Sequence, residues 1–249
     1  MRAVQPGPMI GLISQFALLG ALAGTVGLGG PGWAVGIASG VITNVTLARG
    51  LARHGAAGLG PADRVTLTRA TLVCGVAALT ADSFSRPTPV STLVALTVVA
   101  LVLDAVDGWV ARRTKTASPL GARSDMEVDA FLILVLSVYV ARSTGTWVLA
   151  IGAARYAFVV VRRLLPWMRG TVPPRQWCKV VAATQGVVLT VVAADILPRH
   201  WEYAALAAAL ALLAESFGRE VWWLWSDRPV EPVVWPEPHG LAVVEVRDG

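Results

Sequence analysis

Long apolar stretches, separated by short polar segments or by glycine and proline, run along most of the chain. A helix rises about 1.5 Å per residue, so about 20 apolar residues cross the hydrocarbon core of a bilayer. Stretches rich in Val, Leu and Ala approach this length at residues 9–28, 32–48, 65–81, 90–110, 125–141, 146–161, 180–197 and 201–224. We predict a membrane-spanning helix in each of these eight stretches. Glycine and proline at residues 29–32, and Pro87, Pro89 and Pro198, are predicted to lie in turns and loops.

The composition agrees with this pattern. Hydrophobic residues make up 55% of the 249 residues and charged residues 15%, and the mean hydropathy is +0.62. Soluble globular chains have about 25% charged residues. The low charged fraction and the high mean hydropathy exclude a disordered chain and an ordinary soluble enzyme. Two cysteines are too few for a disulfide-stapled secreted domain. The sequence therefore predicts an all-α, polytopic integral membrane bundle.

The basic residues predict an orientation. If the N-terminus is cytoplasmic and the loops alternate, all but four of the 21 basic residues fall on the cytoplasmic side. Arg86, Arg142 and Arg199 fall outside, and Arg155 falls within a predicted span. Such asymmetry is typical of multi-pass proteins of the cytoplasmic membrane. It also explains the net charge of +5 without nucleic acid as a partner.

The two ends of the chain differ from its middle. Residues 1–60 are predicted to form two transmembrane helices and a cytoplasmic linker. Residues 9–19, with the small residues Ala21 and Ala23 after them, also resemble a signal peptide, but the apolar run continues to Leu28 and favours a retained helix. Residues 61–225 hold the other six predicted helices. Residues 226–249 are rich in proline and are predicted to be disordered.

A group of acidic residues lies where the fourth predicted helix ends and the fifth begins. They are Asp104, Asp107, Asp125, Glu127 and Asp129. Spacings of three and four place Asp104 with Asp107, and Asp125 with Asp129, on one face of their helices. Two antiparallel helices would then aim all four aspartates at one point. Convergent carboxylates suit Mg²⁺ or Mn²⁺, and four of them can hold two ions about 3.5–4 Å apart.

Neighbouring residues favour a phosphate ligand. Gly108 leaves room for a ligand to approach the backbone, Ala111 keeps the same face shallow, and Arg112 offers a forked donor for phosphate. These residues indicate metal-dependent phosphoryl or phosphatidyl transfer at the cytoplasmic membrane surface.

The same residues carry a family resemblance. The pattern D-x2-D-G-x2-A-R-x8-G-x3-D-x3-D resembles the signature of CDP-alcohol phosphatidyltransferases. It is matched at Asp104, Asp107, Gly108, Ala111, Arg112, Gly121, Asp125 and Asp129. Residues 62–69 resemble the family segment P-N-x-L-T-x-x-R, with Asp63 in place of Asn. Residues 179–185 partly resemble G-K-x-K-T-x-x-Q of the glycerophosphate-using branch, with Val181 and Ala182 replacing its second Lys and its Thr. The resemblance covers residues 61–225, the family's six-helix core, and the first two helices are an addition.

The resemblance implies a reaction and roles for residues. Family members move the phosphatidyl part of a CDP-linked lipid, commonly CDP-diacylglycerol, to an alcohol and release CMP. It implies that Asp104, Asp107 and Asp125 ligate the metals, and that Asp129 lies at the metal centre and acts as the general base. The residues implied to contact the CDP part are Gly108, Arg112, Ser118, Asp63 and Thr66. A homodimer is also implied.

Basic residues suggest how the acceptor binds. Arg155 lies within a predicted span, where an ionisable residue is a functional candidate. It could form a phosphate pocket with Arg162, Arg163 and Lys179, and Arg123 could also reach the phosphate. Arg162 and Arg163 can instead be membrane anchors, and Arg155 can instead snorkel toward the interface or pair with a buried carboxylate such as Glu215. Glycerol phosphate, inositol phosphate, serine and other polyols all stay open as acceptors.

Two rival functions remain. The carboxylates of a polytopic protein could serve a transporter of a cation or metabolite, but transport sites usually lie near the bilayer midplane. An inactive family member could serve as a structural partner, although the four intact aspartates argue against lost activity.

Overall fold

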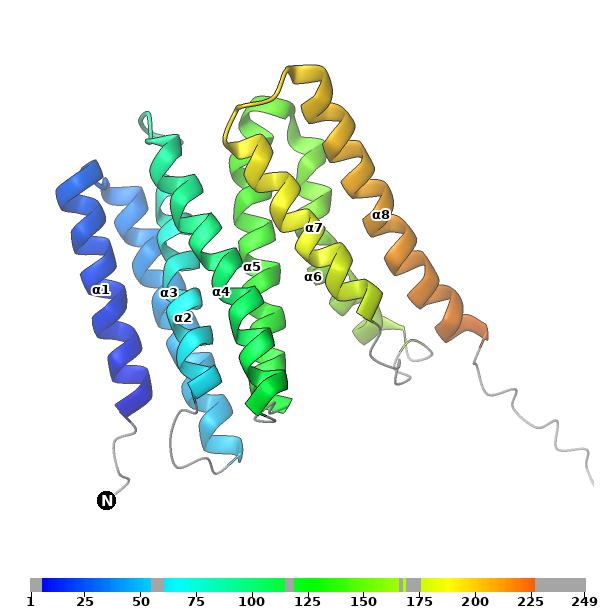
Figure 1. Cartoon of the computed structure of the whole chain (residues 1–249), viewed down its shortest axis with the longest axis horizontal. Coiled ribbons are helices and arrows are strands. Elements are labelled where there is room, and N and C mark those ends of the chain that lie inside the picture. Colours follow the sequence, from blue (N-terminus) through cyan, green and yellow to red (C-terminus); the bar gives the residue numbers. More distant parts are fainter. Residues whose placement is uncertain (1–5, 55–60, 115–118, 166–167, 169–175, 227–249) are drawn as a thin grey trace, which may run out of the picture.

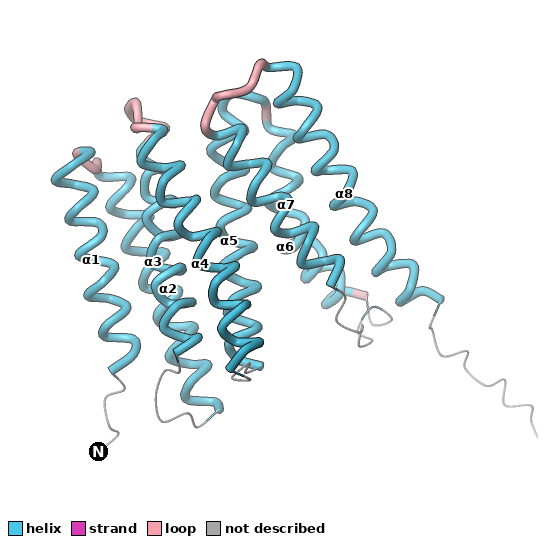
Figure 2. The backbone as a smooth tube through the Cα atoms, in the orientation of Figure 1, coloured by secondary structure: helices cyan, strands magenta, loops and turns pink. Residues whose placement is uncertain are grey.

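A computed structural model of the chain describes residues 6–54, 61–114, 119–165, 168 and 176–226. Throughout this described part the regular elements are helices, joined by short loops (Figure 2). Their order is α1 (Pro6–Val26), α2 (Gly30–His54), α3 (Pro61–Asp82), α4 (Val90–Thr114), α5 (Pro119–Thr144), the short 3-10 helix η1 (Thr146–Val148), α6 (Leu149–Leu164), α7 (Gln176–Ala193) and α8 (Arg199–Ser226). The predicted all-α class is confirmed for these residues.

The helices lie side by side and alternate in direction (Figure 1). The pair α1 and α2 forms one end of the row, and α6, α7 and α8 form the other. Two helices occupy the centre: α3 packs against α1, α2, α4 and α5, while α5 packs against α3, α6 and α7. The C-terminal end of α4 and the N-terminal end of α5 meet at one edge of the molecule (Figure 1).

The membrane-spanning character of these helices is partly supported. Within the described residues, Val65–Asp82 of α3 is long and apolar enough to cross a bilayer, judged by length and composition. Shorter apolar stretches occur at Ile10–Val26, Val90–Val106 and Trp177–Ala193. The eight predicted spans, and the division at residues 60 and 225, stay predictions.

The core lies between the central helices. Leu79 of α3, Leu93 of α4, Leu136 of α5 and Leu189 of α7 are each fully buried. Burial of such side chains is the main favourable contribution to packing between helices in water, whereas within a membrane close van der Waals contact takes that role. The core therefore fixes α4 and α5 against α3, which is the arrangement that the acidic residues need.

The turn between α1 and α2 differs from the prediction at residues 29–32. The chain turns at residues 27–29, where Gly27 adopts a φ of 72°. Pro31 instead lies in the first turn of α2, where its missing N–H group is not needed. The backbone N–H of Gly29 donates to both carboxylate oxygens of Asp82, at 3.1 and 3.2 Å. This contact ties the α1–α2 turn to the end of α3.

Candidate metal centre

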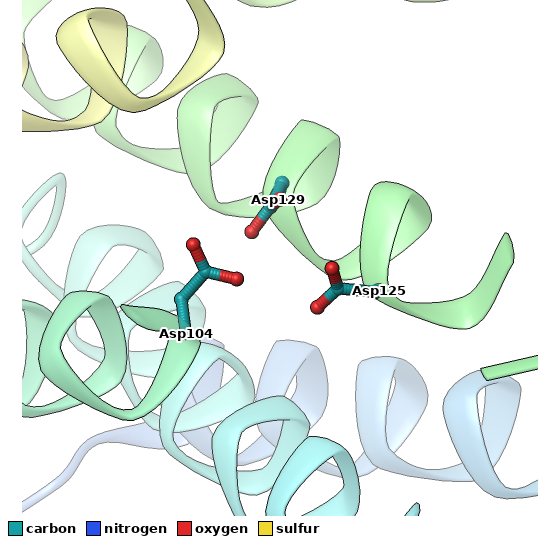
Figure 3. A group of neighbouring side chains, drawn as sticks. All are labelled: Asp104, Asp125 and Asp129. Carbon is teal, nitrogen blue, oxygen red and sulfur yellow. The ribbon is translucent and has the colours of Figure 1, made fainter. Parts of the chain in front are cut away.

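Three aspartates from α4 and α5 meet at one point. Asp104 lies on α4, and Asp125 and Asp129 lie one turn apart on α5, so that the two share a helix face. Each offers a carboxylate oxygen within 4.8 Å of the other two. Figure 3 shows the three side chains directed toward one another. The predicted convergence is thus present for these three aspartates.

A buried arginine of α3 joins the three carboxylates. Arg69 is 1% exposed, whereas Asp104, Asp125 and Asp129 are each about 30% exposed. Its Nη1 donates to Oδ1 of Asp104 at 2.5 Å and to Oδ1 of Asp125. Its Nη2 donates to Oδ1 of Asp129 at 2.7 Å and to the backbone oxygen of Asp125 at 3.2 Å. One guanidinium therefore bridges α3, α4 and α5.

Arg69 is the last residue of the segment 62–69 that resembles P-N-x-L-T-x-x-R, and the sequence alone predicts no role for it. The signal was present, because Arg69 stands among apolar residues of α3, and an ionisable residue in such a stretch is a candidate for function. Its neighbour Thr66, one turn earlier on α3, is also buried. Gly108 lies one turn after Asp104 on α4 and is half-buried. These two predicted donor contacts therefore lie beside the cluster along their helices.

Several predicted site residues cannot be placed in the cluster. Ser118 lies outside the described residues. Others belong to described helices, while their side chains lie outside the described part: Asp63 on α3, Asp107, Ala111 and Arg112 on α4, and Gly121 and Arg123 on α5. Among the described side chains, the geometry of the candidate metal site is therefore given by Asp104, Asp125 and Asp129.

Arg155 has a partner on the far side of α5. Its Nη2 donates to Oε1 of Glu127 at 3.0 Å, and the two side chains are 34% and 56% exposed. Glu127 follows Asp125 by two residues, which is about 200° around a helix. Arg155 thus contacts the side of α5 opposite to the aspartates. The described carboxylate partner of Arg155 is thus the exposed Glu127, whereas the sequence suggests a buried carboxylate such as Glu215.

The other predicted acceptor residues divide between α6 and α7. Arg162 donates from Nε to the backbone oxygen of Met168 at 3.0 Å. Arg163 is exposed on the last turn of α6. Lys179 is exposed near the start of α7, and this helix packs against α4 and α5, which carry the aspartates.

The donor set fits a hard divalent cation. Carboxylate oxygens are the ligands that Mg²⁺ and Mn²⁺ prefer, whereas zinc favours cysteine and histidine. If all three carboxylates are ionised, the cluster with Arg69 carries two negative charges (−3 + 1 = −2), which one divalent cation offsets. Such a cation, held next to a phosphate ester, can stabilise the charge of a leaving group.

Comparison with known protein families identifies a family for most of the chain. The family model described as CDP-alcohol phosphatidyltransferase matches residues 60–215, more than half of the chain and all three converging aspartates. No curated protein and no solved structure matches the chain.

Proposed function

Because the chain belongs to the CDP-alcohol phosphatidyltransferase family, we propose that it transfers a phosphatidyl group from a CDP-linked lipid to an alcohol and releases CMP. The match to this family confirms the resemblance seen in the sequence. The family performs CDP-alcohol phosphotransfer in phospholipid synthesis. The proposed donor is CDP-diacylglycerol. The observation that carries the proposal is the convergence of Asp104, Asp125 and Asp129 on one point.

The proposed metal ligands are Asp104, Asp107 and Asp125, with Asp129 at the same centre. Divalent metal use is typical of the family, and we propose two ions of Mg²⁺ or Mn²⁺. A bound cation supplies charge that offsets the pyrophosphate and the CMP leaving group. Arg112, on the same helix as Asp104 and Asp107, offers a planar fork that matches a phosphate.

Asp129 is the proposed general base. It takes the proton of the acceptor hydroxyl, whose oxygen attacks the phosphorus that carries the lipid. The bond from this phosphorus to the CMP oxygen breaks, so the phosphatidyl group moves and CMP leaves with the electron pair. Asp129 suits this role because its carboxylate is about 30% exposed, and a base must come within hydrogen-bond reach of the proton it removes.

Gly108, Ser118, Asp63 and Thr66 are proposed to contact the CDP part of the donor, together with Arg112. Thr66 and Gly108 support this because each lies one turn from a residue of the cluster, Arg69 or Asp104. A small residue at position 108 leaves backbone accessible to a nucleotide.

Lys179 is a proposed acceptor contact. It is exposed near the start of α7, which packs against α4 and α5, the helices that carry the aspartates, and an ammonium group can bind a phosphate. We therefore propose a polyol phosphate, such as glycerol phosphate or inositol phosphate, as the acceptor. Serine is the competing acceptor, and roles for Arg123, Arg155 and Arg162 in binding the acceptor stay predictions.

The protein is proposed to act as a homodimer in the cytoplasmic membrane, with its aspartates facing the cytoplasm. The excess of basic residues on one side supports this orientation. In Figure 1 the N-terminal end of α1 lies at the same edge as the α4–α5 junction, as the alternating topology requires.

Product analysis tests the proposed function. Purified full-length protein in mixed micelles is incubated with CDP-diacylglycerol, Mg²⁺ or Mn²⁺, and glycerol phosphate, inositol phosphate or serine in turn. We expect CMP and one new lipid, formed only with the cation and the correct acceptor. Uptake of a cation into liposomes without release of CMP would instead support a transporter. Equal CMP release by the Asp125→Asn variant would contradict the proposed site.

A further inference from the structure

Arg69 contacts the three aspartates from the protein interior. The side chain of Arg69 is 1% exposed, while those of Asp104, Asp125 and Asp129 are 31%, 30% and 30% exposed. A cation or substrate that arrives from solvent therefore meets the carboxylates and not the guanidinium. The two sides of the cluster are chemically different, with a fixed positive charge behind the carboxylates and an accessible face in front.

The guanidinium bonds join two helices in a fixed pattern. Nη1 donates to Asp104 of α4 and to Asp125 of α5. Nη2 donates to Asp129, which lies one turn after Asp125 on α5. The hydrogen bonds described above use Oδ1 of each aspartate. A guanidinium is planar, rigid and always charged, so it sets the separation and orientation of the groups that it bonds.

The helix that carries Arg69 is itself held firmly. Leu67, Ala70 and Val73, its neighbours on α3, are buried, and α3 packs against four other helices. Binding geometry is most precise when a site is built on such rigid elements. Movement of Arg69 away from the carboxylates would also leave a buried charge without its partners, which is strongly unfavourable.

An arginine beside metal ligands can have two roles, and these roles predict opposite effects of its removal on metal binding. A placeholder occupies the site and is displaced by the metal, so its removal strengthens metal binding. A positioning residue stays in place and orients the ligands, so its removal weakens metal binding. Burial behind the carboxylates favours the second role.

We propose that Arg69 is a positioning residue that holds Asp104, Asp125 and Asp129 converged from the buried side, so that their outer faces receive the divalent cation. This inference rests on the proposed function, because it takes the aspartates to be metal ligands. It adds a residue of α3 to a site otherwise built from α4 and α5.

Direct measurement of Mn²⁺ binding tests the proposal without turnover. Full-length wild-type protein and the Arg69→Gln and Arg69→Lys variants are purified in detergent, and free Mn²⁺ is followed by electron paramagnetic resonance. Loss of a group that orients metal ligands typically weakens metal binding about 10–100-fold. We expect a loss in this range for Arg69→Gln. Arg69→Lys should also bind more weakly than wild type, because one ammonium nitrogen cannot reproduce the fork that joins α4 and α5.

A matched control removes another arginine, from the loop that follows the same helix. Arg86 donates from Nε to Oδ2 of the buried Asp82 at 2.6 Å. Arg86→Gln breaks this ion pair far along α3 from the cluster and should lower the melting temperature while leaving the Kd for Mn²⁺ unchanged. It thereby separates a general loss of stability from a loss of ligand geometry.

The outcomes distinguish the inference from the function. Equal or tighter Mn²⁺ binding by Arg69→Gln overturns the positioning role, even when the wild type releases CMP. If Arg69→Gln does not fold, Arg69→Lys decides, and wild-type affinity in that variant overturns the proposal. A wild type that neither binds Mn²⁺ nor releases CMP refutes the proposed function, and the inference with it.

Discussion

Replacing Asp129 by asparagine removes the proposed general base and changes the shape of the side chain very little. The asparagine carbonyl oxygen can still accept the hydrogen bond that Arg69 Nη2 donates to Oδ1 of Asp129, at 2.7 Å. Arg69 also keeps its contacts with Asp104 and Asp125. The variant should therefore fold, and its activity should report on the chemistry of position 129.

The expected effect on turnover is large compared with the effect on folding. General base catalysis contributes about 10²–10⁴-fold to a rate, which corresponds to about 3–5 kcal/mol of activation free energy. Exchanging a charged for a neutral hydrogen-bond acceptor costs less than about 2 kcal/mol of folding stability. We expect kcat to fall at least 100-fold while the melting temperature falls by a few degrees.

The assay follows CMP release at saturating donor and acceptor, and donor binding is measured separately by calorimetry. Glu127→Gln is the matched control, because it removes a carboxylate two residues away on the opposite side of α5, where Glu127 is 56% exposed and bonds Arg155. The control should keep near-wild-type kcat. An Asp129→Asn variant that retains a tenth or more of the wild-type kcat would remove Asp129 from the base role, and an equal loss in Glu127→Gln would show that position 129 is not special.

Three further changes test other parts of the structure. Asp125→Asn should weaken Mn²⁺ binding at least about tenfold, because it removes a ligand charge, and an unchanged Kd in electron paramagnetic resonance would exclude Asp125 from the metal site. Lys179→Gln should raise the KM of a phosphorylated acceptor severalfold and leave the donor KM nearly unchanged, and equal changes in both would contradict a specific acceptor contact. Gly152→Ala should lower the free energy of unfolding by about 1–3 kcal/mol, since the new Cβ would lie 2.7 Å from Cα of Leu134 and 2.9 Å from Oγ of Ser137. Gly218→Ala, whose Cβ meets nothing within 4 Å, is its control in thermal melts, and equal destabilisation would refute the packing argument.

The order of the helices could be predicted from hydropathy, but their ends could not. The stretch predicted at residues 125–141 lies within α5, which begins at Pro119 and ends at Thr144. Hydropathy marks the residues that suit hydrocarbon, whereas the helical backbone continues into polar segments as long as its hydrogen bonds are satisfied. The turn between the first two helices lies at residues 27–29, ahead of the predicted 29–32, because Pro31 begins a helix instead of belonging to the turn.

The converging aspartates could be predicted because helical periodicity fixes which residues share a face. Spacing alone placed Asp125 with Asp129, and the antiparallel arrangement of α4 and α5 brought Asp104 to them. The contact between Arg155 and Glu127 could not be predicted in this way, because it depends on how α6 packs against α5. Helical periodicity shows which residues share a face of one helix. It does not show which faces of two different helices meet, so such a contact can be found only from the three-dimensional structure.

Arg69 and Arg155 differ in their surroundings, although both are arginines within apolar helices. Both stand in predicted spans, at residues 65–81 and 146–161, and a functional role is predicted from the sequence for Arg155 alone. In the structure Arg155 is 34% exposed and has one described carboxylate partner, whereas Arg69 is 1% exposed and has three. Three carboxylates in a medium of low dielectric repel one another, and one guanidinium offsets only part of that charge. A divalent cation on the accessible face, where the three carboxylates are about 30% exposed, would offset the remaining charge, so the buried position of Arg69 leaves that face available to the proposed metal.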